Sequence, residues 1–268
     1  YSIGGSGSPD YSTIYDAVKS VVINGINGDV VFNLASGTYD EQVTIQEISG
    51  TSESNSVTFQ SASGDTSDVT IQYTPAYQTH NHVLKLMGAD YLVFKDLSIT
   101  SDTEWCWPVS LVDEATHNRF ESNHIFLQGN VSYDFDHALV HSSSNDSSNF
   151  FIANHFENNV HGISMNGIAE GIDDIQIKNN LFSGMQNFGI YIINSRNLEI
   201  SGNRMSGTTS QMHGSLIYLR NSNGMIFNNF VSAETGLLSY GIYLSNSDMK
   251  VYHNSVRLTG SGSNANYA

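Results

Sequence analysis

A polar turn at residues 129–137 holds the side chains with the clearest catalytic potential in this chain. It carries Asp134, Asp136 and His137, and His161 starts a strand one repeat later. Carboxylates beside an imidazole can act as general acid and base, and a pair of carboxylates can instead hold Ca²⁺. Long turns in a compact fold are disproportionately functional, although a solvated surface turn accounts for the same residues. We expect acid–base chemistry here, or a Ca²⁺ site with Asp134 and Asp136 as ligands.

Three tyrosines recur at nearly equal spacing. Tyr191, Tyr218 and Tyr243 follow one another in steps of 27 and 25 residues. If each step is one layer of a stacked fold, the side chains form a column with roughly 5 Å between neighbours. Exposed aromatic faces suit sugar rings, and a phenol adds a hydrogen bond; the alternative is an aromatic ladder that only stiffens a sheet. Arg220, two residues beyond Tyr218, could meet a uronate carboxylate.

The element that must position these residues is a repeat of the form apolar-x-apolar, turn, Asn-x-apolar. The Asn position, held by Leu97 in the first copy, recurs at residues 97, 123, 154, 180, 203, 229 and 254, in steps of 26, 31, 26, 23, 26 and 25. A step near 25 residues fits three short strands and three turns, which make one rung of a parallel β-helix. Stacked Asn side chains can hydrogen-bond along their column and satisfy the backbone at a bend. Leucine-rich and helical repeats need patterns that are absent here. The sequence therefore predicts an all-β, right-handed parallel β-helix with three-strand rungs of about 25 residues.

A third strand opens each rung, and its middle residue should point outward because side chains alternate along a strand. The expected outward column is Lys85, Ser110, Val140, Ser164, Tyr191, Tyr218 and Tyr243. A second row of residues is expected where the chain enters each of these strands, and it consists of His82, Trp107, His137, His161, Phe188, His213 and Tyr240. His137 and His161 hold like places in this row, so we expect their rings to stack.

The first 80 residues differ from the rest. Residues 10–22 place Ile14, Ala17, Val18, Val21 and Val22 on one helical face. Asp10 or Ser12 can cap the start of this helix, and Gly25 lies past its end. A solenoid end exposes core and sheet edge, so we expect an N-terminal capping α-helix. We interpret residues 1–268 as one domain, with the cap and first rungs in 1–80 and regular rungs in 81–268. The last rung ends without a visible cap, so we expect a truncated C-terminus and further domains of the same chain.

The amino-acid composition limits the classes of molecule that this protein is expected to bind. The chain has 26 Asp and Glu against 10 Lys and Arg, a formal charge of −16. Such a surface disfavours nucleic acid and anionic membranes and favours Ca²⁺, cationic or neutral ligands, although plain solubility also explains it. No run of 18 apolar residues is present, so no membrane insertion is expected. Cys106 is the single cysteine, which excludes an internal disulfide.

The Asn column resembles the asparagine ladder of the pectin-lyase-like β-helix superfamily. The segments at residues 10–18 and 36–43 are similar to the N-terminal cap of pectin methylesterases and of large secreted bacterial β-helix proteins. In this superfamily the substrate lies across the opening strands and the long turn before them. The resemblance therefore implies a secreted or cell-surface location and a polysaccharide partner. It also implies a groove built from the residues singled out above.

In that groove the predicted catalytic residues are Asp134, Asp136, His137, His161 and Lys85. The predicted substrate-binding residues are Tyr191, Tyr218, Tyr243, Arg220, Trp107 and His213. Ca²⁺ on Asp134 and Asp136 is the only cofactor expected. The paired aspartates of polygalacturonases would fall at Asp136 and His137, so one carboxylate of that set is missing.

Two functions stay open. The first is a lyase or glycoside hydrolase acting on a uronate-containing or other extracellular polysaccharide. The second is a non-catalytic module, a glycan binder or a structural or adhesin part of a large secreted surface protein. The missing family motifs favour the second, and the convergence of the polar turn with the histidine row favours the first.

Overall fold

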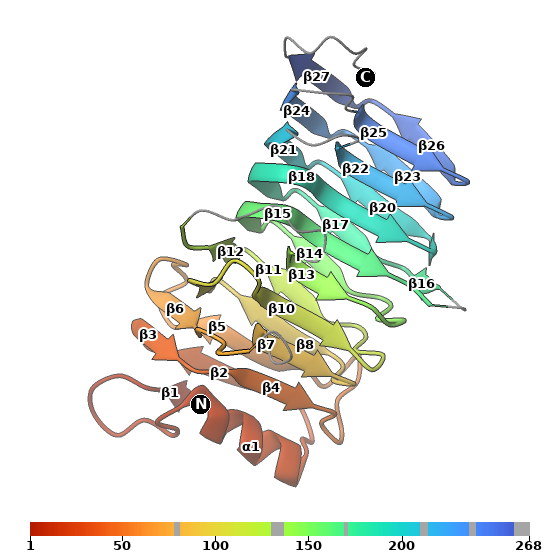
Figure 1. Cartoon of the computed structure of the whole chain (residues 1–268). Coiled ribbons are helices and arrows are strands. Elements are labelled where there is room, and N and C mark those ends of the chain that lie inside the picture. The colour runs from red at the N-terminus through yellow and green to blue at the C-terminus, as the bar shows by residue number, and fades with distance from the viewer. Residues whose placement is uncertain (78–80, 130–136, 169–170, 210–213, 236–239, 260–268) are drawn as a thin grey trace.

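Equivalent strands of successive repeats lie on one another along the whole chain, as in the right-handed parallel β-helix that the sequence predicts (Figure 1). The computed structural model describes residues 1–77, 81–129, 137–168, 171–209, 214–235 and 240–259. It contains about eight turns of solenoid. Pairing is parallel between all of the described strands that form its sheets.

Each rung contributes strands to three faces, which we call the opening, middle and closing faces. The opening face consists of β4 (Val43–Gln46), β7 (His82–Met87), β10 (Trp107–Val112), β13 (Ala138–Ser142), the later parts of β15 (His155–Asn166) and β18 (Leu181–Ile193), β22 (Ser215–Arg220) and β25 (Tyr240–Ser245). The middle face consists of β1 (Ser2–Ile3), β2 (Val30–Leu34), β5 (Val57–Ser61), β8 (Leu92–Lys95), β11 (Arg119–Glu121), β14 (Phe150–Ile152), β17 (Gln176–Lys178), β20 (Leu198–Ser201), β23 (Asn223–Phe227) and β26 (Asp248–Tyr252). The closing face consists of β3 (Gly37–Asp40), β6 (Val69–Gln72), β9 (Ser98–Ser101), β12 (His124–Leu127), the first parts of β15 and β18, β21 (Arg204–Thr209), β24 (Phe230–Thr235) and β27 (Ser255–Thr259). Two short strands, β16 (Ile172–Asp173) and β19 (Ser195–Arg196), pair outside these faces.

The predicted asparagine ladder is present at the bend between the middle and closing faces. From Asn123 to Asn254, each side-chain Nδ2 donates to the Oδ1 of the next Asn at 2.9–3.1 Å. Each Oδ1 also accepts the backbone N–H of the preceding ladder position, and that position is Leu97 at the start of the column. The ladder thus satisfies buried backbone groups that a sheet cannot satisfy at a corner.

The residue before each ladder position has positive φ, from Asp96 (φ 55°) through Asn179 (φ 56°) to His253 (φ 56°). This left-handed conformation makes the corner sharp, and Asn, Asp and Gly tolerate it best. The repeat therefore requires two residues in succession, one that accepts the strained backbone and one that satisfies the exposed amide.

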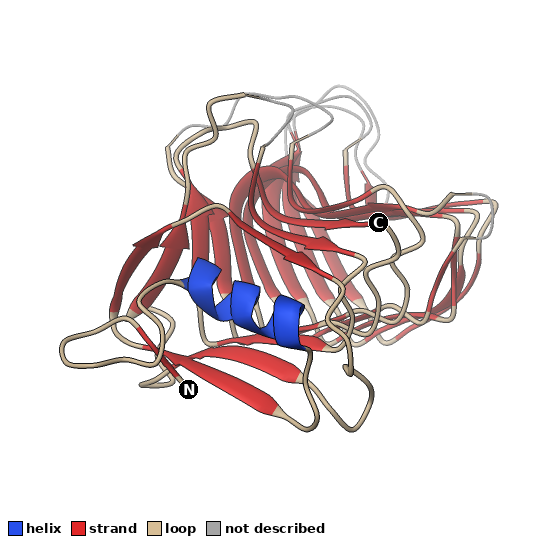
Figure 2. Cartoon of the chain, turned by 90° about the horizontal axis from the view of Figure 1, so that it is seen from below, coloured by secondary structure: helices blue, strands red, loops and turns tan. Residues whose placement is uncertain are grey.

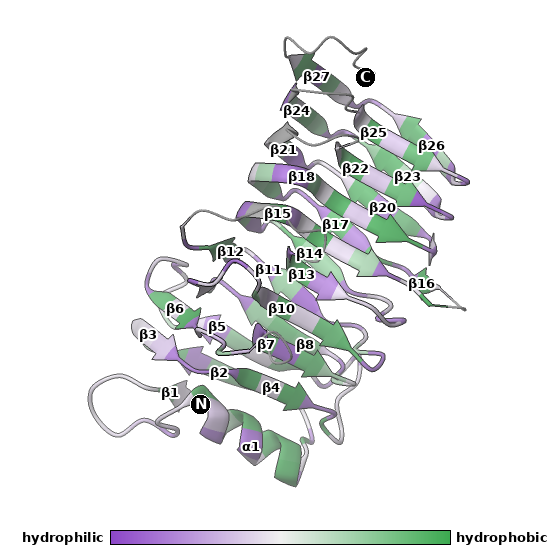
Figure 3. Cartoon of the chain, in the orientation of Figure 1, coloured by the Kyte–Doolittle hydropathy of each residue, from purple (hydrophilic) through white to green (hydrophobic). Residues whose placement is uncertain are grey.

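A column of phenylalanines fills the interior behind the middle face. Phe32, Phe59, Phe94, Phe120 and Phe151 stack in turn, with 4.9–5.6 Å between ring centroids and interplanar angles of 7–25°. All five side chains are fully buried. Hydrophilic and hydrophobic residues alternate along many strands (Figure 3), as expected for strands with one side in the core and the other side in water.

Helix α1 (Ile14–Asn24) lies across the N-terminal end of the solenoid (Figure 2) and contacts β4, which confirms the predicted capping helix. Its N-cap is Thr13, whose hydroxyl accepts the Asp16 N–H at 3.0 Å, so the expectation of Asp10 or Ser12 as the cap is wrong. The Glu41 carboxylate accepts the free N–H groups of Ile14 and Tyr15 at 3.0 and 2.9 Å. No helix within the described residues is long and apolar enough to span a membrane.

Candidate functional site

The three tyrosines of the predicted column lie in register on the opening face. Tyr191 pairs with Tyr218, and Tyr218 pairs with Tyr243. Their ring centroids are 5.0 and 5.2 Å apart, with interplanar angles of 17° and 14°. We call these three residues the tyrosine ladder.

Because the rings are stacked, Tyr218 has a neighbouring ring against each of its faces. A sugar ring cannot lie flat on it, which corrects the expectation that aromatic faces are exposed to a ligand. The ladder instead presents ring edges and a row of phenol oxygens. Among the described residues none of these three oxygens has a hydrogen-bond partner.

Two further aromatic side chains contact the ladder. Phe188 lies 5.0 Å from Tyr191 and 5.3 Å from Tyr218, and His161 stacks on Phe188 at 5.0 Å. Phe188 and His161 are 3% and 1% exposed. Burial, together with the neighbouring Tyr218, raises the pKa of Tyr191, while Arg220 opposes this effect. The Tyr191 phenol is therefore a hydrogen-bond donor at neutral pH.

Arg220 ends β22 on the same face, paired in register with Ile193 and Ser245. Its side chain is exposed and has no ion-pair partner in the described part of the chain. A guanidinium in this position can accept a carboxylate in a bidentate pair. The ladder and Arg220 together form a surface whose phenol and guanidinium groups can donate hydrogen bonds to a ligand. The three phenols follow one another along the solenoid axis.

One rung of the column departs from its predicted register. His141, and not Val140, lies between Ser110 and Ser164, while Val140 pairs with Val109 and is fully buried. The His141 ring stacks on Trp107, with 3.7 Å between centroids and 4° between planes. Sequence reasoning missed His141 because Leu139 and Val140 are both apolar, so the strand can be aligned in either register. The alternation of Val140, His141 and Ser142 was the signal that could have found it.

Of the predicted catalytic residues, the structure places His137 and His161 next to each other and Lys85 farther away. His161 pairs with Ala138, one residue away from His137, so the expectation that His137 and His161 hold like places on adjacent rungs is wrong. The two residues are joined through the backbone, where the His161 N–H donates to the His137 carbonyl at 3.1 Å. Lys85 lies on β7, with β10 and β13 between it and β15, so about 14 Å of sheet separates it from His161.

Three predicted site residues, Asp134, Asp136 and His213, lie outside the described residues. The acid–base role of the polar turn and its Ca²⁺ site stay predictions for that reason. Trp107 and His137 are described, and both belong to the opening side of the solenoid.

A family model described as a right-handed β-helix region matches residues 127–267, a little more than half of the chain. A comparison with curated protein sequences finds no match.

Solved structures with a similar fold include YbhC of Escherichia coli, at 11% identity and a TM-score of 0.49, covering 98% of this chain and 85% of that one. A pectin methylesterase from carrot has 10% identity and a TM-score of 0.46, covering 98% and 83%. PfbA, a surface adhesin of Streptococcus pneumoniae, has 12% identity and a TM-score of 0.39, covering 92% and 88%. At these values the likeness carries no argument about activity.

Proposed function

The chain belongs to the right-handed β-helix family, and we propose that it is a secreted or cell-surface protein that binds a polysaccharide along the tyrosine ladder. The observation that carries the proposal is the in-register row of Tyr191, Tyr218 and Tyr243, whose phenol oxygens lack partners in the described part of the chain. A row of identical donors along the solenoid axis suits an extended polymer with a repeating pattern of hydroxyls. The rigid stack also reduces the entropy that is lost when a ligand orders the side chains.

Arg220 favours a polysaccharide that carries carboxylates. The net charge of −16 opposes the approach of a polyanion, but charges more than about 8 Å away are largely screened at physiological salt. Once the polymer is in contact, the Arg220 guanidinium can hold one of its carboxylates in a bidentate pair. We infer a uronate-containing glycan as the preferred ligand and a neutral glycan as the weaker one.

Catalysis at the polar turn is the second candidate, because Asp134 and Asp136 directly precede His137 in the sequence. It would make the protein a lyase or glycoside hydrolase, with Ca²⁺ bound by Asp134 and Asp136 as predicted from the sequence. Binding is placed first for two reasons. His161 is 1% exposed, and Lys85 is about three strands away from it.

The test compares Tyr218→Phe with wild type in calorimetric titrations with oligosaccharides of pectin, alginate and chitin type. The substitution removes one hydroxyl and keeps the stack, so the expected loss is about 0.5–1.5 kcal/mol, or roughly 2- to 10-fold in affinity. Tyr252→Phe is the matched control, because Tyr252 stacks on Phe227 at 5.1 Å but lies on the middle face. Equal loss in both variants, or no binding by wild type, contradicts the proposal.

The same glycans, incubated with and without Ca²⁺, separate binding from catalysis. Release of reducing ends or unsaturated uronates that disappears in His137→Ala would establish the enzyme. Binding without turnover, weakened by Arg220→Ala for the uronate polymers alone, is the result we expect.

A further inference from the structure

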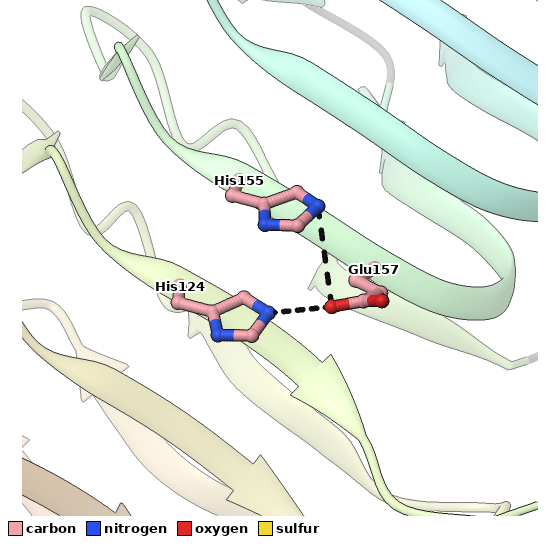
Figure 4. A group of neighbouring side chains, drawn as sticks. All are labelled: His124, His155 and Glu157. Carbon is pink, nitrogen blue, oxygen red and sulfur yellow. Dashed lines mark hydrogen bonds and ion pairs between the residues drawn. The ribbon is translucent and has the colours of Figure 1, made fainter. Parts of the chain in front are cut away.

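A second cluster of functional side chains lies on the closing face, separate from the tyrosine ladder. His124 on β12 pairs in register with His155 on β15, and their rings stack with 4.7 Å between centroids and 7° between planes. Glu157, two residues beyond His155 on the same side of the strand, directs its carboxylate between them (Figure 4). Its Oε2 is 2.8 Å from Nε2 of His124 and 4.0 Å from Nε2 of His155.

The solenoid brings these groups together without any loop rearrangement. Residues one rung apart stand side by side, and alternation along the strand puts residues 155 and 157 on one surface. The ligand atoms all lie within 4.8 Å of one another, and all three side chains are partly exposed to solvent. A small cation can therefore reach them directly.

We propose that His124, His155 and Glu157 bind a divalent transition-metal ion, with Zn²⁺ as the natural probe. Two imidazoles and a carboxylate are a common protein ligand set for Zn²⁺, and water completes the tetrahedron at sites that keep one position open. Bonds of about 2.0–2.2 Å place the ligand atoms roughly 3.3 Å apart in such a centre. The present separations of 2.8 and 4.0 Å lie on either side of that value.

Binding requires two small adjustments. The parallel rings must tilt toward each other, because a metal lies close to the plane of each imidazole that binds it. Nε2 of His155 must also release the Ser183 hydroxyl, which is 2.7 Å away and then stays beside the ion as a hydrogen-bonding neighbour. Imidazole ligands select Zn²⁺, Cu²⁺, Ni²⁺ and Co²⁺ over Ca²⁺ and Mg²⁺, which prefer sets of oxygen ligands. This site is therefore distinct in chemistry from the Ca²⁺ site predicted at the polar turn.

The experiment titrates ZnCl₂ into the metal-free chain, prepared without a histidine tag, and measures heat and stoichiometry. We expect one Zn²⁺ per chain, with affinity reduced roughly tenfold or more in His124→Ala, His155→Ala and Glu157→Gln. His117→Ala is the matched control, because His117 is an exposed histidine that stacks on Tyr91 at 4.7 Å on another part of the surface. Its affinity should equal that of wild type.

A spectroscopic readout keeps the test independent of folding defects. Co²⁺ bound at this site should give visible d–d absorption that Glu157→Gln, the near-isosteric variant, weakens while its circular dichroism stays unchanged. Absence of Zn²⁺ binding, or equal affinity in the control and the three site variants, would overturn the proposal.

Discussion

Replacing Asn180 by Ala tests whether the asparagine ladder is a major source of stability in this solenoid. The Asn180 side chain is 1% exposed and makes four hydrogen bonds. Its Nδ2 donates to the Phe151 carbonyl at 2.8 Å and to Oδ1 of Asn203 at 3.0 Å. Its Oδ1 accepts the N–H of Asn154 at 2.8 Å and the Nδ2 of Asn154 at 3.1 Å. Truncation leaves the buried Asn154 N–H without its acceptor and removes three further hydrogen bonds, one of them to the Phe151 carbonyl on β14.

The unpaired Asn154 N–H costs about 1–3 kcal/mol and each of the three other lost hydrogen bonds about 0.5–1.5 kcal/mol, so we expect Asn180→Ala to lower the free energy of unfolding by about 4 kcal/mol. Asn254→Ala is the control. Asn254 makes the same kinds of contact, with Asn229 and with the carbonyls of Ile226 and Tyr252, but it is only partly buried. Water can replace its hydrogen bonds there, so a loss of about 1 kcal/mol is expected.

Urea unfolding of both variants, followed by circular dichroism, measures the two losses. Amide hydrogen exchange at Asn154 adds a local readout, because its N–H loses its acceptor in Asn180→Ala and keeps it in Asn254→Ala. Losses that agree within about 0.5 kcal/mol, or unchanged exchange at Asn154, would refute the reasoning.

Three further outcomes follow from the core. Phe120→Ala should lower unfolding free energy by about 3–5 kcal/mol in urea titrations, since its ring is stacked between two others, while Phe120→Leu should cost less than about 1.5 kcal/mol. Burial raises the pKa of the Cys106 thiol to about 12, so a thiol reagent at pH 8 should react only in the unfolded chain; fast reaction in the native state would contradict this. Burial also raises the pKa of Asp146, against hydrogen bonds that lower it, so its contribution to stability is present below the unfolded pKa and is lost as pH rises through the folded pKa. Wild type should therefore lose more stability than Asp146→Asn between acid and neutral pH, and equal pH slopes in urea unfolding would contradict this.

The repeat, the capping helix and the three faces of the solenoid could all be predicted from the sequence. Period-two alternation decides which side of a strand is buried, and this requires only local information. The ladder of Asn residues could be predicted because each one solves the same local problem, a buried backbone amide at a sharp corner. The steps between Tyr191, Tyr218 and Tyr243 placed them in one column for the same reason, since the turns between their rungs are similar in length.

The register predicted after the irregular polar turn is wrong, because two adjacent apolar residues, Leu139 and Val140, allow the strand to be aligned in either register. The step of 31 residues from Asn123 to Asn154 also separates Ser110 from His141, so His141 takes the place expected for Val140. Which N-terminal hydroxyl caps α1 depended equally on the local path of the chain, and that path selected Thr13.

What the sequence determined by itself is the architecture, because every rung repeats one local solution to burial and backbone satisfaction. What only the tertiary structure decided is how side chains from different rungs meet. Stacking covers both ring faces of Tyr218 and leaves the hydroxyls of the tyrosine ladder as the groups that we propose for recognition. The pairing of β12 with β15 turns two histidines 31 residues apart, together with Glu157, into one candidate metal site. The physical reason is that distances across rungs depend on register and side-chain rotamer, neither of which a one-dimensional pattern contains.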